Sequence, residues 1–232
     1  LPCQRWYDSI IKWVEKRHHM TVRQEEIGFI PGIVRGIAFA LNCFTQPGDK
    51  VMVQPPVYHP FFLVSERNHR QVVYSPLSIH DQQVHIDFQR FEKDIKGCKL
   101  FILCNPHNPT GRSWTRDELE SVGALCLRNG VTVLSDEIHS DLVFSPNKHT
   151  VFASLCPEFA AQAVTLTAPS KTFNIAGMTI SNIITSDEKR REAVSREITL
   201  SMGSYINLFG MAACRAAYNE AEAWLDELLP VL

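Results

Sequence analysis

Five side chains with useful chemistry follow apolar segments of the sequence, near the point where each segment ends. They are Tyr58 after "KVMVQ", Asn108 after "KLFILC", Asp136 and His139 after "VTVLS", and Lys171 after "AVTLT". A phenol, an amide, a carboxylate, an imidazole and an amine can move protons or hold a cofactor. If the segments are neighbouring strands, these groups meet at one rim, because open α/β sheets bind ligands beyond the carboxyl ends of their strands.

Lys171 stands in surroundings that are unusual for a surface lysine. It lies in "TLTAPSKTFNIAGM", after a strand-like segment and before Phe173, Ile175 and Ala176. The alternative is a lysine whose stem is buried and whose charged head is solvated. We expect instead a dry pocket, which favours the neutral amine that covalent and proton-transfer chemistry need.

A place for a phosphate is predicted where the segment "FIPGIV" enters a helix. The first N–H groups of a helix have no partner within it, so the amides of Gly32, Ile33 and Val34 can face an anion. A phosphate cradle beside a lysine and a carboxylate indicates pyridoxal 5′-phosphate (PLP) as the cofactor.

Each of the four main side chains then has a task. Lys171 forms a Schiff base with PLP and later moves the Cα proton of the substrate. Asp136 holds the pyridine nitrogen protonated, so that the ring withdraws electrons from Cα. Tyr58 stacks on the ring, and Asn108 donates to the phenolic O3′.

The elements that must position these residues alternate along the chain. Apolar, β-branched runs predict strands at 50–54, 71–75, 99–104, 131–135, 163–167 and 178–186. Helical spacing predicts helices at 7–20 with Asp8 or Ser9 as N-cap, 32–44, 60–68, 88–95, 115–129 capped by Gly130, 188–200 and 206–229. This order predicts an α/β fold, a doubly wound, mostly parallel sheet flanked by helices, in one domain.

Composition excludes several classes of protein. The 232 residues are 45% hydrophobic and carry 23 basic and 25 acidic side chains that are mixed along the chain, so no nucleic-acid partner is expected. No apolar stretch approaches the roughly 20 residues of a membrane span, and no membrane partner is expected. The seven cysteines form no CxxC pair, so we expect reduced thiols in a cytoplasmic protein and no metal site. His80 and His85 have loose metal-like spacing, but we expect them in a surface loop.

Five motifs in order resemble a known family. "FIPGIV", "PPVYHPF", "NPHNPTG", "SDEIHSDL" and "TAPSKTFNIAG" are similar to the fold-type I, aspartate-aminotransferase-like PLP enzymes, and most similar to their MalY/PatB branch of cystathionine β-lyases, or C–S lyases. The resemblance implies the roles given above for Lys171, Asp136, Asn108 and Tyr58. It also implies His139 as a cofactor contact of the lyase branch and Ser170 as a phosphate ligand.

The sequence departs from the family pattern in two ways. Many relatives have a serine three residues before the lysine and an arginine eight after it, where this chain has Ala168 and Thr179. Family members also have an N-terminal segment and a C-terminal small domain that supplies a carboxylate-binding arginine. By resemblance, residues 1–232 are the PLP-binding large domain of a longer enzyme that is a homodimer.

The function implied is cleavage of L-cystathionine or a related cysteine S-conjugate, a small amino-acid substrate, to thiol, pyruvate and ammonia. An aminotransferase using the same residues is one alternative. A regulatory or binding protein that retains PLP is another.

Each candidate residue also has a purely structural interpretation. Asp136 could cap the following segment, and Asn108 could belong only to a turn. Tyr58 could be a core aromatic, and His139 could be satisfied by a neighbouring carboxylate. The convergence of all the motifs on one rim is the reason to prefer a site.

Overall fold

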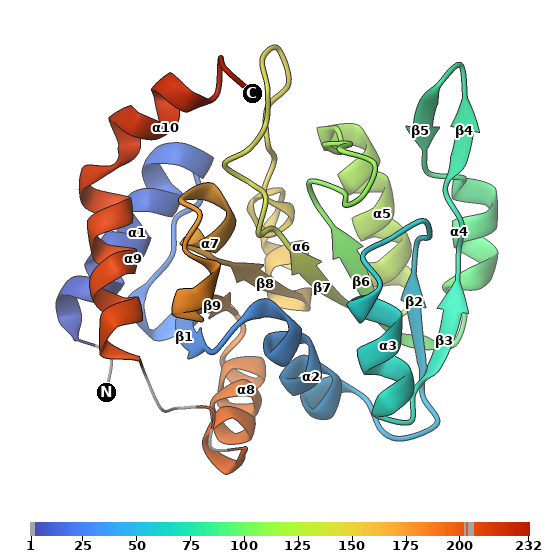
Figure 1. Ribbon diagram of the computed structural model, residues 1–232. Helices are drawn as coiled ribbons and strands as arrows, with labels where there is room; N and C mark the ends of the chain where they lie inside the picture. Colours follow the sequence, from blue (N-terminus) through green and yellow to red (C-terminus); the bar gives the residue numbers. More distant parts are fainter. Residues whose placement is uncertain (1–2, 202, 204–206) are drawn as a thin grey trace.

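The computed structural model describes residues 3–201, 203 and 207–232. Its centre is a seven-stranded sheet of order β1-β9-β8-β7-β6-β2-β3 (Figure 1). The strands are β1 (Ile27–Ile30), β2 (Lys50–Val53), β3 (Gln71–Tyr74), β6 (Cys98–Cys104), β7 (Thr132–Asp136), β8 (Ala163–Thr167) and β9 (Ser181–Ile184). Neighbours from β3 to β8 are parallel, and β9 runs antiparallel to both β8 and β1. The predicted α/β, mostly parallel sheet is confirmed.

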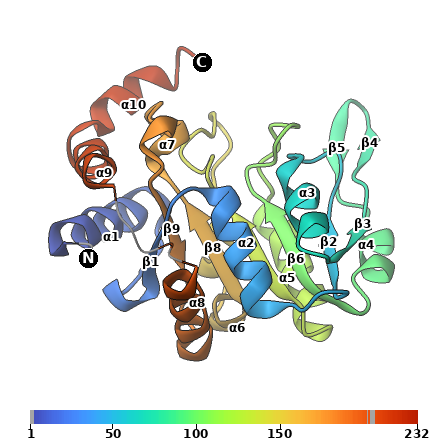
Figure 2. The ribbon, with the colours of Figure 1, turned by 60° about the horizontal axis from the view of Figure 1, so that its bottom comes forward.

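Helices cover both faces of this sheet. They are α1 (Gln4–His18), α2 (Ile33–Phe44), α3 (Pro60–Arg67), α4 (Phe88–Asp94), α5 (Arg116–Arg128), α6 (Pro157–Gln162), α7 (Pro169–Thr172), α8 (Glu188–Leu200), α9 (Leu208–Glu220) and α10 (Glu222–Leu228). Figure 2 shows α2 and α8 in front of the strands. A small hairpin, β4 (Ser78–His80) and β5 (Gln83–His85), stands apart from the sheet.

The central strands are apolar throughout because both of their faces are buried. Alternate residues of β6 enter different cores: Leu100 and Ile102 pack on the side of α2 and α3, whereas Phe101 and Leu103 pack on the side of α4 and α5. A third core joins α1, α9 and the β1–β9 edge. Burial on both faces therefore explains the continuous apolar runs in the sequence.

Local signals set several helix boundaries. Thr115 accepts from the Glu118 N–H, and the Glu118 side chain accepts from the Thr115 N–H, which begins α5 with a capping box. Gly130 follows α5 in the left-handed region with φ of 64°. Gly36 lets α2 approach the sheet closely, because a Cβ there would lie 2.4 Å from Ile30 Cδ1.

Three predicted boundaries are wrong. The first helix begins at Gln4 after Cys3, so neither Asp8 nor Ser9 caps it, and the Ser9 hydroxyl instead donates to the Arg5 carbonyl within the helix. The strand expected at 178–186 is shorter, since Thr179 adopts φ of 45° just before it. The last helix divides at Ala221 into α9 and α10, and its expected start at 206 lies outside the described residues.

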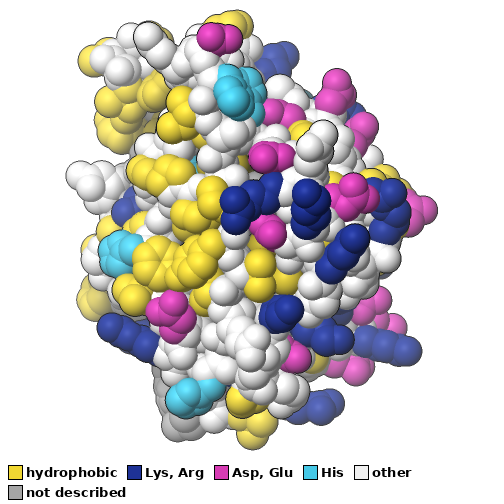
Figure 3. Space-filling view, turned by 90° about the vertical axis from the view of Figure 1, so that its right-hand side faces the viewer, with side chains coloured by type: hydrophobic (Ala, Val, Ile, Leu, Met, Phe, Trp, Pro, Cys, Tyr) yellow, Lys and Arg dark blue, Asp and Glu magenta, His cyan; other side chains and the backbone are white. Residues whose placement is uncertain are grey.

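No helix in the described ranges is long and apolar enough to cross a bilayer. The seven cysteines are free thiols, of which Cys98, Cys104, Cys126 and Cys214 are buried. His80 and His85 lie on the β4–β5 hairpin, with ring centroids 6.2 Å apart. Figure 3 shows basic and acidic side chains interleaved on the face that carries this hairpin.

Candidate active site

Eight of the nine predicted site residues line one cavity of about 420 Å³. They are Gly32, Ile33, Val34, Tyr58, Asn108, Asp136, His139 and Lys171. The ninth, Ser170, is buried beside Lys171 in α7 and is not among the lining residues. The structure thus brings the carboxyl ends of β6, β7 and β8 to one place, as the parallel strand order requires.

Lys171 reaches the cavity from α7, the single helical turn that follows β8. The expectation that it lies in a dry environment is wrong, because Lys171 is exposed at the rim of the cavity. Its position is nevertheless well defined by its neighbours, since Ser170 and Thr172 on either side are buried. The chain fixes the backbone at Lys171 and leaves the amine accessible.

Asp136 ends β7 and is buried, with 4% of its surface exposed. Burial raises the pKa of Asp136 to about 7, and the nearby charge of Glu137 also raises it. The Ile138 N–H donates to its Oδ1 at 3.2 Å and Lys171 lies near, and both lower the pKa without outweighing burial. A carboxylate that is costly to ionise alone gains strongly from a cationic partner in the cavity.

Asn108 and Tyr58 are joined by the backbone. The Tyr58 N–H donates to the Asn108 carbonyl at 3.0 Å, which ties the loop after β2 to the loop after β6. Tyr58 is 36% exposed and lies edge-on to Phe61 with centroids 5.8 Å apart. The Tyr58 side chain therefore lines the cavity and does not belong to the hydrophobic core. Asn108 lines the cavity as well.

The entrance of α2 forms an open cradle. Gly32 has φ of 106°, a conformation that favours glycine, and a Cβ there would meet no described atom within 4 Å. Among the described residues, no side chain caps this helix end. The first amides of α2 therefore face the cavity with room for an anion.

Other lining residues lie outside the predicted set. Arg35 lies three residues beyond Gly32 in the first turn of α2, and Cys104 is the last residue of β6. Thr179, which the sequence marks only as a departure from the family, lies in the lining too. Arg35 could have been predicted from the sequence, because it lies in the same helical turn as the expected phosphate cradle.

His139 is half-buried in the loop after β7 and lines the cavity. Burial lowers the pKa of His139, and the charge of Lys171 lowers it further. The imidazole is thus held in its neutral form, which can accept or donate one hydrogen bond.

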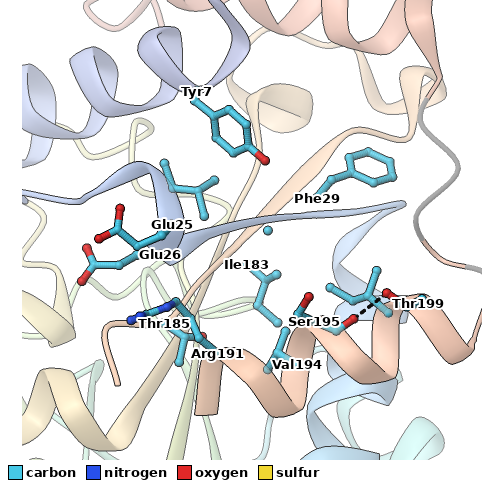
Figure 4. Close-up of a pocket in the computed structure, with 13 residues that line it drawn as sticks. Tyr7, Glu25, Glu26, Phe29, Ile183, Thr185, Arg191, Val194, Ser195 and Thr199 are labelled. Atoms are coloured by element: carbon cyan, nitrogen blue, oxygen red, sulfur yellow. Dashed lines mark hydrogen bonds between the residues drawn. The ribbon is translucent and has the colours of Figure 1, made fainter. Parts of the chain in front are cut away.

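A second cavity, of about 260 Å³, lies at the β1–β9 edge beside α8 (Figure 4). Glu25, Glu26 and Arg191 lie on one side of it in the figure, with Tyr7 and Phe29 across the apolar middle. None of the predicted site residues is in its lining. The convergence of functional groups is a property of the first cavity.

The donor set of the first cavity fits PLP. Its volume of about 420 Å³ lies within the roughly 300–1,000 Å³ usual for small-molecule sites. It presents an accessible amine at Lys171, a buried carboxylate at Asp136, and the amides of the Gly32 cradle for a phosphate. These are the groups that an aldehyde, a pyridinium nitrogen and a phosphate require.

The chain belongs to the family of aminotransferases of class I and II, whose model matches residues 7–229. It is 47% identical over 230 residues to cystathionine beta-lyase PatB of Bacillus subtilis, an alignment that covers 98% of this chain and 59% of PatB. It is 30% identical over 223 residues to protein MalY of Escherichia coli, covering 95% of this chain and 56% of MalY. The predicted family resemblance is confirmed.

The fold matches that of solved structures over the whole chain. The crystal structure of cystalysin from Treponema denticola, which contains PLP, superposes with a TM-score of 0.97 at 37% identity. That match covers 100% of this chain and 59% of the cystalysin chain. The chain thus spans slightly more than half the length of the two curated relatives above.

Proposed function

We propose that the protein is a PLP-dependent carbon–sulfur β-lyase that cleaves L-cystathionine or a related cysteine S-conjugate to thiol, pyruvate and ammonia. The observation that carries the proposal is the shared cavity of Lys171, Asp136, Asn108 and Tyr58. The similarity to PatB, a cystathionine beta-lyase by name, favours this reaction over others of the family.

When bound, PLP supplies an electron sink conjugated to the Cα of the substrate. Lys171 would hold the aldehyde carbon through its Nζ, and once the amino group of the substrate has displaced that nitrogen, the freed amine would take the Cα proton. Asp136 would hold a proton on the pyridine nitrogen, and its burial would keep water from competing for that contact. The Cβ–S bond breaks with its electron pair on sulfur, and the remaining three-carbon fragment hydrolyses to pyruvate and ammonia.

Tyr58 and Asn108 orient the reacting groups. The exposed ring of Tyr58 supplies a flat face for the cofactor ring, and its backbone bond to Asn108 keeps the two loops in register. The Asn108 amide donates to O3′ in this proposal. Ser170, which is buried next to Lys171 and is not among the cavity-lining residues, is the proposed side-chain ligand of the phosphate beside the Gly32 cradle.

The lyase reaction is tested by following its products. We expect L-cystathionine to give thiol and pyruvate in equal amounts, without added 2-oxo acid. The family as a whole makes aminotransfer the alternative. Transfer of the amino group to a 2-oxo acid without thiol release would overturn the lyase proposal, and absence of Cα hydrogen exchange with every substrate would favour a PLP-retaining regulatory protein.

Arg35 is proposed to supply positive charge to the phosphate. It lines the cavity in the first turn of α2, and position 179, where many relatives carry an arginine, is Thr179 here. We expect Arg35→Gln to weaken PLP binding about tenfold, because a charge-assisted hydrogen bond to a phosphate is lost. Absorbance titration with PLP, and competition by inorganic phosphate, measure the change.

The matched control is Arg196→Gln, which removes an exposed arginine of α8 that lies outside this cavity. Its affinity for PLP should equal that of the wild type. Equal affinities of the Arg35 and Arg196 variants would remove Arg35 from the phosphate site.

We propose that residues 1–232 are the PLP-binding large domain of an enzyme that acts in the cytoplasm as a homodimer. Support for the dimer comes from large apolar side chains that are exposed near the cavity and on the adjoining face, among them Tyr58, Tyr74 and Ile79. Figure 3 shows apolar side chains gathered on part of this face. Light scattering of the purified protein should give twice the mass of one chain.

A further inference from the structure

The carboxylate of Asp141 is a buried junction behind the candidate lysine. Only 4% of its side chain is exposed. Its Oδ1 accepts from Trp13 Nε1 at 3.1 Å and lies 2.7 Å from His18 Nε2. Its Oδ2 accepts from the Thr172 hydroxyl at 2.7 Å. One carboxylate therefore joins α1 to α7, in which Thr172 directly follows Lys171.

The helix that carries Lys171 needs such an anchor. α7 has four residues, and a single helical turn has little stability of its own. Beyond the turn, Phe173 packs against Trp13 and Tyr218, with centroids 5.5 and 6.2 Å away. This aromatic contact holds the apolar side of the segment, and the Thr172 hydrogen bond fixes its rotation.

The hydrogen bonds to Asp141 are charge-assisted. Burial raises the pKa of Asp141, but hydrogen bonds and charge from His18, with the bonds from Thr172 and Trp13, outweigh burial and leave the pKa lowered. The group is thus ionised and accepts only, so the Thr172 hydroxyl must donate. A bond of this type is stronger and more directional than one between neutral groups.

We propose that Asp141 is a positioning residue that, through the Thr172 hydroxyl, holds Lys171 at the angle at which its amine meets the PLP aldehyde. This inference rests on the proposed function of Lys171. Asp141 lies outside the lining of the cavity, so it acts on the reaction only through α7 and α1. The motif "SDEIHSDL", in which Asp141 stands, does not by itself show that this carboxylate has a positioning role.

The test uses Thr172→Val, which keeps the shape of the side chain and removes its hydroxyl. We expect PLP to attach to residue 171 about tenfold more slowly, because the lost bond lets the amine sample other orientations. Attachment is followed by borohydride reduction at timed intervals and mass spectrometry of the labelled peptide. The pH profile of the absorbance band of the same link should shift as well.

Two variants separate positioning from general destabilisation. Thr172→Ser keeps the donor and should restore the wild-type rate. Thr165→Val makes the same substitution at another buried threonine, one whose hydroxyl has no hydrogen-bond partner among the described residues, and should leave the rate unchanged. Circular dichroism confirms that each variant is folded. If Thr172→Val does not fold, Thr172→Ala, which also removes the hydroxyl donor, takes its place with the same expected slowing.

The outcomes are distinct. If PLP labels residue 171 in the wild type and labels folded Thr172→Val at the same rate, the positioning role is wrong and the proposed function is unaffected. If PLP labels a residue other than 171 in the wild type, both the proposed function and the positioning role are wrong. Slowing that Thr172→Ser does not rescue also contradicts the proposal, because packing and not the hydroxyl would then be responsible.

Discussion

Lys171→Ala is expected to abolish the borohydride-reducible link between the protein and PLP and to lower lyase activity by about 10³-fold or more. The variant loses both the covalent attachment and the amine that moves the Cα proton. Absorbance spectra with and without borohydride, and product assays with L-cystathionine, measure the two losses. Alanine is compatible with the helical turn of α7, so the fold should survive.

A lysine outside the cavity gives the control. Lys148→Ala removes an exposed lysine from the loop after β7, and both the spectrum and the activity should match the wild type. A reducible band that persists in Lys171→Ala, located on another lysine by peptide mapping, would show that the assignment is wrong.

Asp136→Asn is expected to lower activity by about 10²–10³-fold, the usual effect of removing one preorganised electrostatic partner. An amide cannot hold the pyridine nitrogen in its protonated form as a carboxylate does, although it can still accept the hydrogen bond from the Ile138 N–H. Steady-state kinetics measure the loss. Asp81→Asn, on the exposed turn of the β4–β5 hairpin, is the matched control and should retain full activity.

The same substitution at Asp136 should stabilise the PLP-free protein, with a definite pH dependence. Burial raises the pKa of Asp136 to about 7 in the folded state. The folded protein therefore loses stability as the pH rises from about 4, the ordinary pKa of an aspartate, to about 7. The amide of the Asp136→Asn variant carries no charge, and the advantage of the variant should grow from about pH 4 to about pH 7 and then stay constant, at up to about 4 kcal/mol. Urea unfolding at several pH values measures it. An advantage that shrinks with rising pH would contradict the raised pKa.

Asp141→Asn should show the opposite trend. The pKa of Asp141 is lowered, so its ionised form stabilises the folded state at neutral pH, and this contribution disappears as the pH falls through the folded-state pKa. The same urea unfolding series measures it. Asp136 ends β7 and Asp141 lies five residues further on, so this comparison separates the effect of environment from that of residue type.

The central strands of the sheet were predictable because both of their faces are buried. Continuous apolar runs such as Leu100–Cys104 are typical of strands buried on both faces, and the site residues follow from the rule about carboxyl ends of strands. The strand Ile27–Ile30 was missed because Gly28 interrupts its apolar run and because its partner β9 lies far along the chain. Long-range pairing of this kind cannot be read from one segment.

The site was predictable in its residue types and less so in its environment. Exposure of Lys171 depends on how far α7 stands from its neighbours, which no sequence spacing specifies. Likewise, Arg35 lines the cavity because the first turn of α2, which follows Gly32, is oriented toward it. Packing angles between elements decided both outcomes.

The contact between Gly36 and Ile30 has a mechanical consequence for the cavity. A side chain at position 36 would force either the Ile30 side chain or α2 to move, since its first carbon would lie 2.4 Å from Ile30 Cδ1. Any movement of α2 at this contact would also move the amides of its first turn, because they lie only about one turn from Gly36. The absence of a side chain at Gly36 thus helps to set the position of the phosphate cradle, although Gly36 is not among the residues that line the cavity.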